Sequence, residues 1–351
     1  MKISDLKPRG IPKTEVKFGK VTVATCPPDE NFYTSNLIEF FAYEGKWQLP
    51  AQPRMDSVVR KTKTGLEVVE MNKLKVGDEV VLSKSGRPED GIYITTLSEA
   101  SDKTAEFAFM SNTVSPERPV DYNELAQIIK KESKLGEVVW VLGPAVVHAR
   151  AIEAMAWLVK NGYVGAILGG NAVAVHDLEH SIFRTSLGMD DKGCGITDGH
   201  RTHMDTITAI KSAGSIKKAV EKGIIKDGIM YECVQNEVPF VLAGSIRDDG
   251  PLPDTITDAI ESQNAMRAHT IKASCVVMLA TALHSIATGN MMPTYMVRDD
   301  EILPVPVICV DKDEFTISKL ADRGTAQAYP IVGNVREVVS SIARELASRD
   351  L

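Results

Sequence analysis

The chain has 351 residues, with 25% charged and 44% hydrophobic residues, a formal net charge of −7 and a pI near 5.6. This length allows two domains with sizeable cores, and the acidic balance argues against nucleic acid or an anionic membrane as a partner. The five cysteines show no C-x-x-C spacing, so neither a disulfide framework nor a zinc site is indicated. Without a leader-like segment or a membrane-length apolar run, the chain is expected to be cytoplasmic.

The first segment, residues 1–115, is expected to form a β-rich domain. Short β-prone runs occur at 16–25, 57–60 and 65–69, and in 74–82 a Gly77-Asp78 turn separates two apolar pieces. Repeated strands at short spacing are typical of a small barrel. Such a domain is expected to contribute little chemistry by itself.

Residues 116–351 show the alternation of a doubly wound parallel sheet. A surface helix over 119–134 precedes an apolar strand at 138–142, a glycine turn, an alanine-rich helix over 151–161 and a second strand at 164–168. This repetition predicts an α/β, Rossmann-like domain. Further buried strands are expected at 238–243, 275–280 and 305–310, and further helices over 202–212, 216–222, 256–268, 318–323 and 335–348.

Polar or glycine-containing segments follow the five expected strands, at 143–144, 169–171, 245–249, 281–284 and Asp311. In a parallel sheet these ends meet at one edge. Glycines at this edge let phosphate oxygens approach the backbone N–H groups. The N-termini of the following helices favour the negative charge of the phosphate. The acid at the end of the last strand, Asp311, suits the ribose hydroxyls and favours NAD over NADP. Because G-x-G-x-x-G is absent, the nucleotide site is indicated only in outline.

Five longer motifs carry a family resemblance: GPAVVH at 143–148, GNAVAVHD at 170–177, GIMYEC at 228–233, AGSIRDDGPLPD at 243–254 and LATALHS at 279–285. With them the chain resembles the family named for its LOR/SDH conserved region. Archaeal members, and the C-terminal part of cyanobacterial arginine-degrading proteins, are ornithine cyclodeaminases. The resemblance implies a Rossmann-like NAD domain distantly similar to deoxyhypusine synthase, and conversion of ornithine to proline and ammonia.

The resemblance also implies cofactor-binding positions. Longer relatives carry an additional N-terminal α+β module, most of which this chain is expected to lack. Residue 282 is alanine, where a larger residue is expected in the relatives. A contact between the backbone of residue 282 and the cofactor does not depend on the size of the side chain. The implied cofactor residues are Asn171, Ala172, Asp249, Thr281, Ala282, Leu283, His284 and Asp311.

Ornithine cyclisation requires a group for the substrate carboxylate, acids for two amines and a base. Arg247 suits the carboxylate through its planar guanidinium group. Asp248, Asp249 or Asp254 is expected to bind the substrate amines. The candidates for the general base, in order of preference, are Glu232, Cys233, His200 and His203. The alternatives are a core position for Cys233 and helix-capping or phosphate-contacting roles for the two histidines.

Three questions stay open in the sequence. The cluster from His176 to His180 resembles a metal-ligand set, but no metal is expected, because the two histidines share a face only if the helix begins by 176. The apolar residues Met291, Met292, Tyr295 and Met296 are expected at a homo-oligomer interface, in a dimer or tetramer, with a lid or the core as alternatives. The alternative functions are an amino-acid or opine/saccharopine-type dehydrogenase and a non-catalytic NAD-binding regulator.

Overall fold

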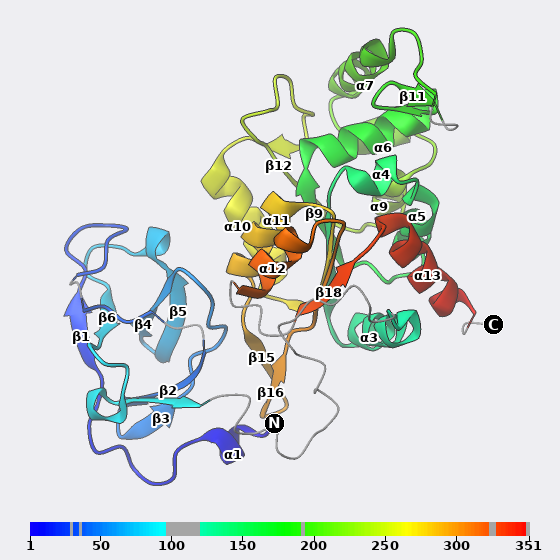
Figure 1. The fold of residues 1–351 in the computed structure, drawn as a ribbon. Helices are drawn as coiled ribbons and strands as arrows, with labels where there is room; N and C mark the ends of the chain where they lie inside the picture. The colour runs from blue at the N-terminus through cyan, green and yellow to red at the C-terminus, as the bar shows by residue number, and fades with distance from the viewer. Residues whose placement is uncertain (29–30, 35–36, 96–119, 191–193, 323–327, 349–351) are drawn as a thin grey trace. The chain divides into compact units, whose positions relative to one another are not determined.

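The computed structural model describes residues 1–28, 31–34, 37–95, 120–190, 194–322 and 328–348. It divides into two units (Figure 1). The smaller unit comprises 1–111, 290–305 and 324–327, and the larger comprises 112–289, 306–323 and 328–351. The expected boundary between 115 and 116 lies outside the described residues. The expectation of two contiguous domains did not include segment 290–305, which joins the smaller unit.

The smaller unit is built from antiparallel strands, as the β-prone runs indicated. A short helix, α1 (Ile3–Leu6), precedes them. One sheet has the order β1-β6-β4-β5, another β3-β2-β7, and β15 and β16 form a hairpin. The bounds are β1 Lys17–Lys20, β2 Ile38–Tyr43, β3 Lys46–Gln48, β4 Ser57–Thr62, β5 Gly65–Glu70, β6 Glu79–Leu82, β7 Ile92–Thr95, β15 Tyr295–Arg298 and β16 Glu301–Pro304.

Three of the four apolar residues expected at a homo-oligomer interface are buried within the chain, and the fourth, Met296, is half-buried. Met291, Met292 and Tyr295 are only 3%, 6% and 1% exposed. Tyr295 packs in a core with Phe40 and Ile302, and its hydroxyl donates a hydrogen bond to the Pro50 carbonyl at 3.2 Å. These side chains therefore stabilise the smaller unit itself, which corresponds to the core alternative.

The larger unit contains a seven-stranded parallel sheet in the order β13-β12-β9-β8-β14-β17-β18. The chain enters at β8, moves outward to β13, returns to β14 beside β8, and moves outward again to β18. The strand order therefore reverses between β8 and β14, which is where doubly wound sheets bind ligands. The bounds are β8 Glu137–Leu142, β9 Ala166–Gly170, β12 Phe240–Ala243, β13 Thr255–Ile256, β14 Ala273–Leu279, β17 Val307–Asp311 and β18 Ala328–Val332.

Helices cover both faces of this sheet (Figure 1). On one face α3 (Tyr122–Leu135), α5 (Ile152–Lys160) and α13 (Val335–Ala347) share a core with Trp140 of β8. On the other, α10 (Ala259–Thr270) lies against β8 and β12, and α12 (Glu314–Asp322) against β17 and β18. This explains why the central strands read as continuous apolar runs without alternation.

The chain between β9 and β12 carries most of the polar residues discussed below. It contains α6 (Asn171–Phe183), the hairpin β10 (Thr185–Ser186) and β11 (Met189–Asp190), α7 (Gly199–Ala213), α8 (Ile216–Glu221) and α9 (Ile229–Gln235). Leu178 of α6 and Ile210 of α7 share a second core with Leu242 of β12. This core fixes the polar faces of α6 and α7 relative to the sheet.

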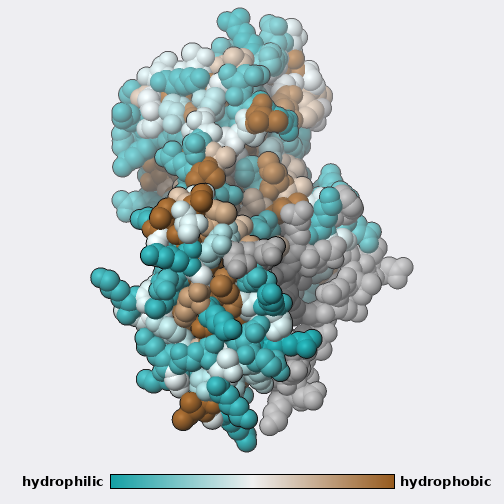
Figure 2. All heavy atoms as spheres, turned by 90° about the vertical axis from the view of Figure 1, so that its left-hand side faces the viewer, coloured by the Kyte–Doolittle hydropathy of each residue, from teal (hydrophilic) through white to brown (hydrophobic). Residues whose placement is uncertain are grey.

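Every helix in the described part of the chain is too short or too polar to cross a bilayer. Figure 2 shows one face of the molecule on which hydrophilic residues predominate and hydrophobic ones are scattered.

Candidate functional site

A cavity of about 530 Å³ lies at the carboxyl ends of β8, β9 and β12 and beside the start of α11 (Ala282–Met291). Its volume is within the range of about 300–1,000 Å³ that is usual for small-molecule sites. We call it the switch-point cavity. Ten residues singled out in the sequence line it: Asn171, Ala172, His176, His200, His203, Arg247, Asp248, Thr281, Leu283 and His284.

Two glycines allow the backbone and side chains to come close at this edge. A Cβ atom on Gly143 would lie 2.0 Å from the Ala280 carbonyl oxygen, and one on Gly170 would lie 2.9 Å from Cε1 of His284. Gly143 N also donates to the Leu279 carbonyl at 2.9 Å. Glycine is thus required at 143, where β8 meets the chain leaving β14, whereas a side chain at 170 would force the His284 ring to move.

Asn171 begins α6 and is buried, with 6% exposure. Its Oδ1 accepts hydrogen bonds from Leu252 N at 3.0 Å and from Thr255 Oγ1 at 3.2 Å. The side chain therefore holds the loop that follows β12, and the backbone at the helix N-terminus is what faces the cavity. That arrangement suits a phosphate oxygen.

The loop after β12 places a cation and an anion at the cavity. Asp248 Oδ2 accepts from Ser245 N at 2.8 Å, which fixes the carboxylate. The neighbouring Arg247 is exposed and forms no ion pair with any described residue. The pKa of the nearby His284 is lowered by burial, against the opposing charge of Asp248.

Three residues expected to act on substrate lie away from the cavity lining. Cys233 is 1% exposed in the core beneath α9, and burial raises the pKa of its thiol far above the usual value, which corrects its assignment as a base. Glu232 accepts a hydrogen bond from Asn236 Nδ2 at 2.9 Å on α9 itself. Asp254 Oδ2 accepts from Ile216 N at 2.9 Å and so caps α8. Their placement argues against catalytic roles.

Asp254→Ala tests this correction. The change removes an acceptor for a part-buried amide at the start of α8, so the free energy of unfolding is expected to fall by about 1 kcal/mol. Turnover per folded molecule should stay unchanged. Chemical denaturation and steady-state assays measure the two effects, and a large loss of turnover at full stability would restore Asp254 as a catalytic candidate.

Three other implied cofactor residues, Asp249, Ala282 and Asp311, are absent from the lining of the switch-point cavity. Asp249 is exposed on the loop after β12, and Ala282 begins α11. Asp311 ends β17, and its Oδ1 accepts from Asp313 N at 3.0 Å. Their contacts with a cofactor remain predictions.

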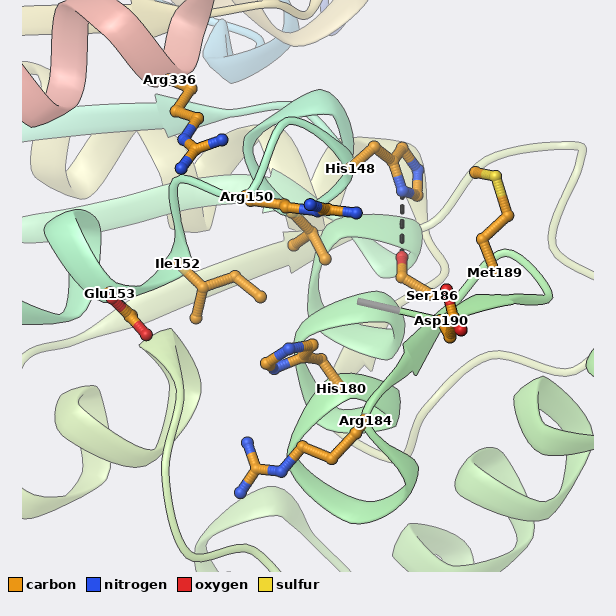
Figure 3. A pocket seen from close by; sticks show the side chains of 11 residues that line it. His148, Arg150, Ile152, Glu153, His180, Arg184, Ser186, Met189, Asp190 and Arg336 are labelled. Atoms are coloured by element: carbon orange, nitrogen blue, oxygen red, sulfur yellow. Dashed lines mark hydrogen bonds between the residues drawn. The ribbon is translucent and has the colours of Figure 1, made fainter. Parts of the chain in front are cut away.

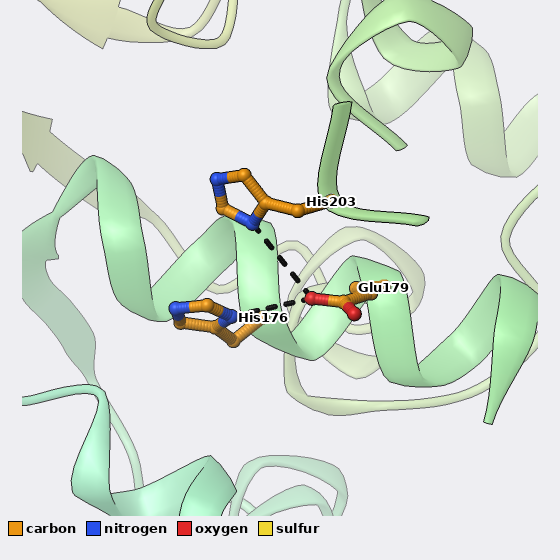
Figure 4. A group of neighbouring side chains, drawn as sticks. All are labelled: His176, Glu179 and His203. Atoms are coloured by element: carbon orange, nitrogen blue, oxygen red, sulfur yellow. Dashed lines mark hydrogen bonds and ion pairs between the residues drawn. The ribbon is translucent and has the colours of Figure 1, made fainter. Parts of the chain in front are cut away.

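A cluster of acid and imidazole groups extends from the cavity into α6 and α7 (Figure 4). Glu179 is fully buried, and its Oε2 lies 3.3 Å from Nδ1 of His176 and 3.7 Å from Nδ1 of His203. Its Oε1 accepts from the hydroxyls of Thr185 at 3.0 Å and Thr202 at 2.9 Å. Both histidines also line the cavity. In Figure 4 the second nitrogen of each ring lies on the side away from Glu179.

The carboxylate of this cluster is held ionised. Burial alone would raise the pKa of Glu179, but the hydrogen bonds from His176, Thr202 and Thr185, together with the nearby His203 ring, outweigh it and keep the pKa at about 2. His148, whose ring centroid is 4.7 Å from that of His176, has its pKa lowered to about 4 by burial and by His176. The cluster is thus a permanent anion flanked by imidazoles.

The helix α6 begins at Asn171, so the condition under which His176 and His180 share a helix face is met. His176 meets Glu179 and His203, and His180 lines another cavity. One ligand atom from each of His176, Glu179 and His203 lies within 4.8 Å of the others, so the donor types of a metal site are present. The hydrogen bonds that Glu179 makes with His176, Thr185 and Thr202 match an arrangement that holds protons, and the absence of a metal stays a prediction.

A doubly wound sheet with its cavity at the switch point defines a Rossmann-type nucleotide-binding protein. Two family models match: residues 123–342 correspond to "arginine dihydrolase ArgZ-like, C-terminal, Rossmann fold", and 40–123 to the first region of the same C-terminal part. The chain belongs to this ArgZ-like C-terminal family.

Individual relatives agree with the family match. An ornithine cyclodeaminase of Methanopyrus kandleri is 42% identical over 92% of this chain and 76% of its own length. The crystal structure of a LOR/SDH protein from Methanococcus maripaludis superposes with a TM-score of 0.85 at 35% identity, covering 96% of this chain and 99% of that one. A ternary complex of AgrE with ornithine and NAD+ superposes with a TM-score of 0.61 at 36% identity, over 98% of this chain and 48% of that one.

Proposed function

We propose that this protein is an NAD-dependent ornithine cyclodeaminase, which converts L-ornithine to L-proline and ammonia. The observation that carries the proposal is the convergence of Arg247, Asp248, His203 and His284 on one cavity at the sheet's switch point. The relatives named ornithine cyclodeaminase, and the AgrE complex with both ornithine and NAD+, support it.

The residues present fit a dinucleotide. Gly170 leaves no room for a side chain between the strand end and His284, and the N-terminus of α6 faces the same cavity. Backbone amides and glycines of this kind accept phosphate groups. When bound, NAD supplies a hydride acceptor for the Cα of ornithine and returns the hydride after ring closure, so the overall reaction is redox-neutral.

The protein's own side chains then have distinct tasks. Arg247 binds the substrate carboxylate with two parallel N–H donors, and Asp248 holds an ammonium group beside it. His203 takes a proton through Nε2, since its Nδ1 faces Glu179. This proton transfer frees the amine for attack on the oxidised carbon, and ammonia leaves. Glu179 touches no substrate and is a positioning residue.

The product balance tests the function. Purified protein with catalytic NAD and excess ornithine should yield proline and ammonia in equal amounts, without a lasting rise in NADH absorbance. Stoichiometric NADH would instead identify an amino-acid or opine-type dehydrogenase. NAD binding without any turnover of ornithine would identify a non-catalytic NAD-binding regulator.

Arg247→Ala should raise the KM for ornithine by about 10–100-fold, because a charge-assisted pair worth about 1.5–3 kcal/mol is lost. NAD affinity should stay near the wild-type value. Titration of NAD by fluorescence and of ornithine by initial rate separates the two. A conservative Arg247→Lys variant should recover part of the loss, since it restores charge without the bidentate geometry.

We also infer a role in proline formation, a cytoplasmic location and a homo-oligomeric state. All five cysteines carry free thiols, three of them buried, which supports a reducing compartment. Light scattering after size-exclusion chromatography tests the oligomeric state.

A further inference from the structure

A second cavity of about 480 Å³ lies beside the C-terminal half of α6, within the same unit. We call it the arginine cavity. Figure 3 shows Arg150, Arg184 and Arg336 reaching it from three elements. Arg150 lies between α4 (Ala145–His148) and α5, Arg184 follows α6, and Arg336 is in the first turn of α13.

One of the three guanidinium groups in the arginine cavity forms an ion pair with a described carboxylate. Arg184 pairs with Asp227. Neither Arg150 nor Arg336 forms an ion pair with any described residue, and both are exposed. Of the two carboxylates in the lining, Asp190 already accepts from Cys194 N at 2.8 Å, and Glu153 is the other. A chain with a net charge of −7 thus concentrates guanidinium groups here.

Backbone strain accompanies two of these arginines. Arg150 has φ +63° and Arg184 φ +57°, in the left-handed region where glycine is favoured. Arg184 occupies the position after a helix that commonly carries glycine. Non-glycine residues with such backbone angles cost conformational free energy. They cluster at ligand sites, where contacts of the side chain with the ligand offset that cost.

The rest of the lining indicates the shape of a ligand. Val147, Ile152 and Met189 supply an apolar wall beside the cations, and the volume is several times what one phosphate needs. We propose that the arginine cavity binds a small phosphorylated molecule, with Arg150 and Arg336 holding the phosphate oxygens and the apolar wall contacting the organic part. Guanidinium groups bind phosphate bidentately.

Such a ligand would contact the active-site cluster through one residue. His148 lines the arginine cavity and shares a hydrogen bond of 3.0 Å between its Nδ1 and Ser186 Oγ. Its ring also contacts His176, which lines the switch-point cavity. Binding of a ligand in the arginine cavity does not depend on the proposed reaction.

Binding to the holoprotein tests the proposal. With NAD saturating and ionic strength constant, calorimetric titration with glycerol 3-phosphate should give a Kd that Arg336→Gln and Arg150→Gln each weaken by about tenfold, the effect of one lost charge-assisted contact. Glu153→Gln should tighten it, because a carboxylate is removed from the same lining. Lys160→Gln, an equal charge change at the exposed end of α5, should have no effect.

Several results of these titrations would contradict the proposed phosphate site. No binding at millimolar concentration, or binding that both arginine variants leave unchanged although circular dichroism shows them folded, would overturn the proposal. Succinate binding as tightly as the phosphate ester would also overturn it, in favour of a dicarboxylate ligand. Inorganic phosphate should bind more weakly than the ester, since it leaves the apolar wall uncovered.

Discussion

His203→Ala is expected to lower kcat for proline formation by about 10²–10⁴-fold, the usual contribution of a positioned general base. His203 lines the switch-point cavity, and its side chain is 29% exposed, against 6% for His176. Glu179 occupies the Nδ1 side of the ring, which leaves Nε2 for the substrate ammonium. Initial rates at saturating ornithine and NAD measure the effect.

Cys233→Ala is the matched control for that variant. The thiol is buried in the core beneath α9, so the substitution should lower stability and leave kcat unchanged. An unchanged kcat in His203→Ala would remove this residue from the mechanism. His176 and His200, which line the same cavity, would then be the remaining imidazole candidates.

The central sheet was predictable because each strand is buried on both faces. Expected strands at 138–142 and 275–280 match β8 and β14 closely. The edge strand β18 was missed because it contains Pro330, which argues against a strand by pattern alone. Proline is tolerated there because an edge strand has neighbours on only one side. The strand β2 was missed because Glu39 interrupts its apolar run; this carboxylate is buried and accepts a hydrogen bond from the Tyr33 hydroxyl at 2.9 Å.

The convergence of Asn171, Thr281 and His284 on one cavity was also predictable, since parallel strands end together and glycines mark close approach. The acid and imidazole cluster was not. Glu179 and His203 lie on different helices, and only the packing of α6 against α7 brings them together. Asp254 shows the opposite failure: its position in a polar loop suggested chemistry, whereas its carboxylate caps α8. Sequence reveals which residues can ionise, but hydrogen-bond partners decide what each one does.

Glu179→Gln is expected to lower kcat by about 10–100-fold while leaving the KM for ornithine nearly unchanged, because Glu179 orients the imidazoles and does not touch the substrate. The pKa of about 2 keeps Glu179 ionised throughout the working range, so it produces no acid limb of its own. Initial rates over a range of ornithine concentrations separate the effect on kcat from the effect on KM.

Stability provides an independent measure of the same residue. A carboxylate whose pKa falls from 4.5 to about 2 on folding stabilises the native state above pH 4.5, and that contribution is lost as the pH falls toward 2. Glu179→Gln should lack this part of the acid destabilisation in denaturation measured at several pH values. An unchanged pH–stability curve would contradict the ionised, hydrogen-bonded state of Glu179.

The double variant H203A/E179Q decides whether Glu179 acts through His203. If it does, the second substitution has little left to remove, and kcat should stay close to that of His203→Ala alone, because residues that act as a unit are non-additive. A loss equal to the product of the two single losses would mean that Glu179 contributes separately. Since Glu179 also contacts His176 at 3.3 Å, that separate contribution would then be sought in the His176 ring.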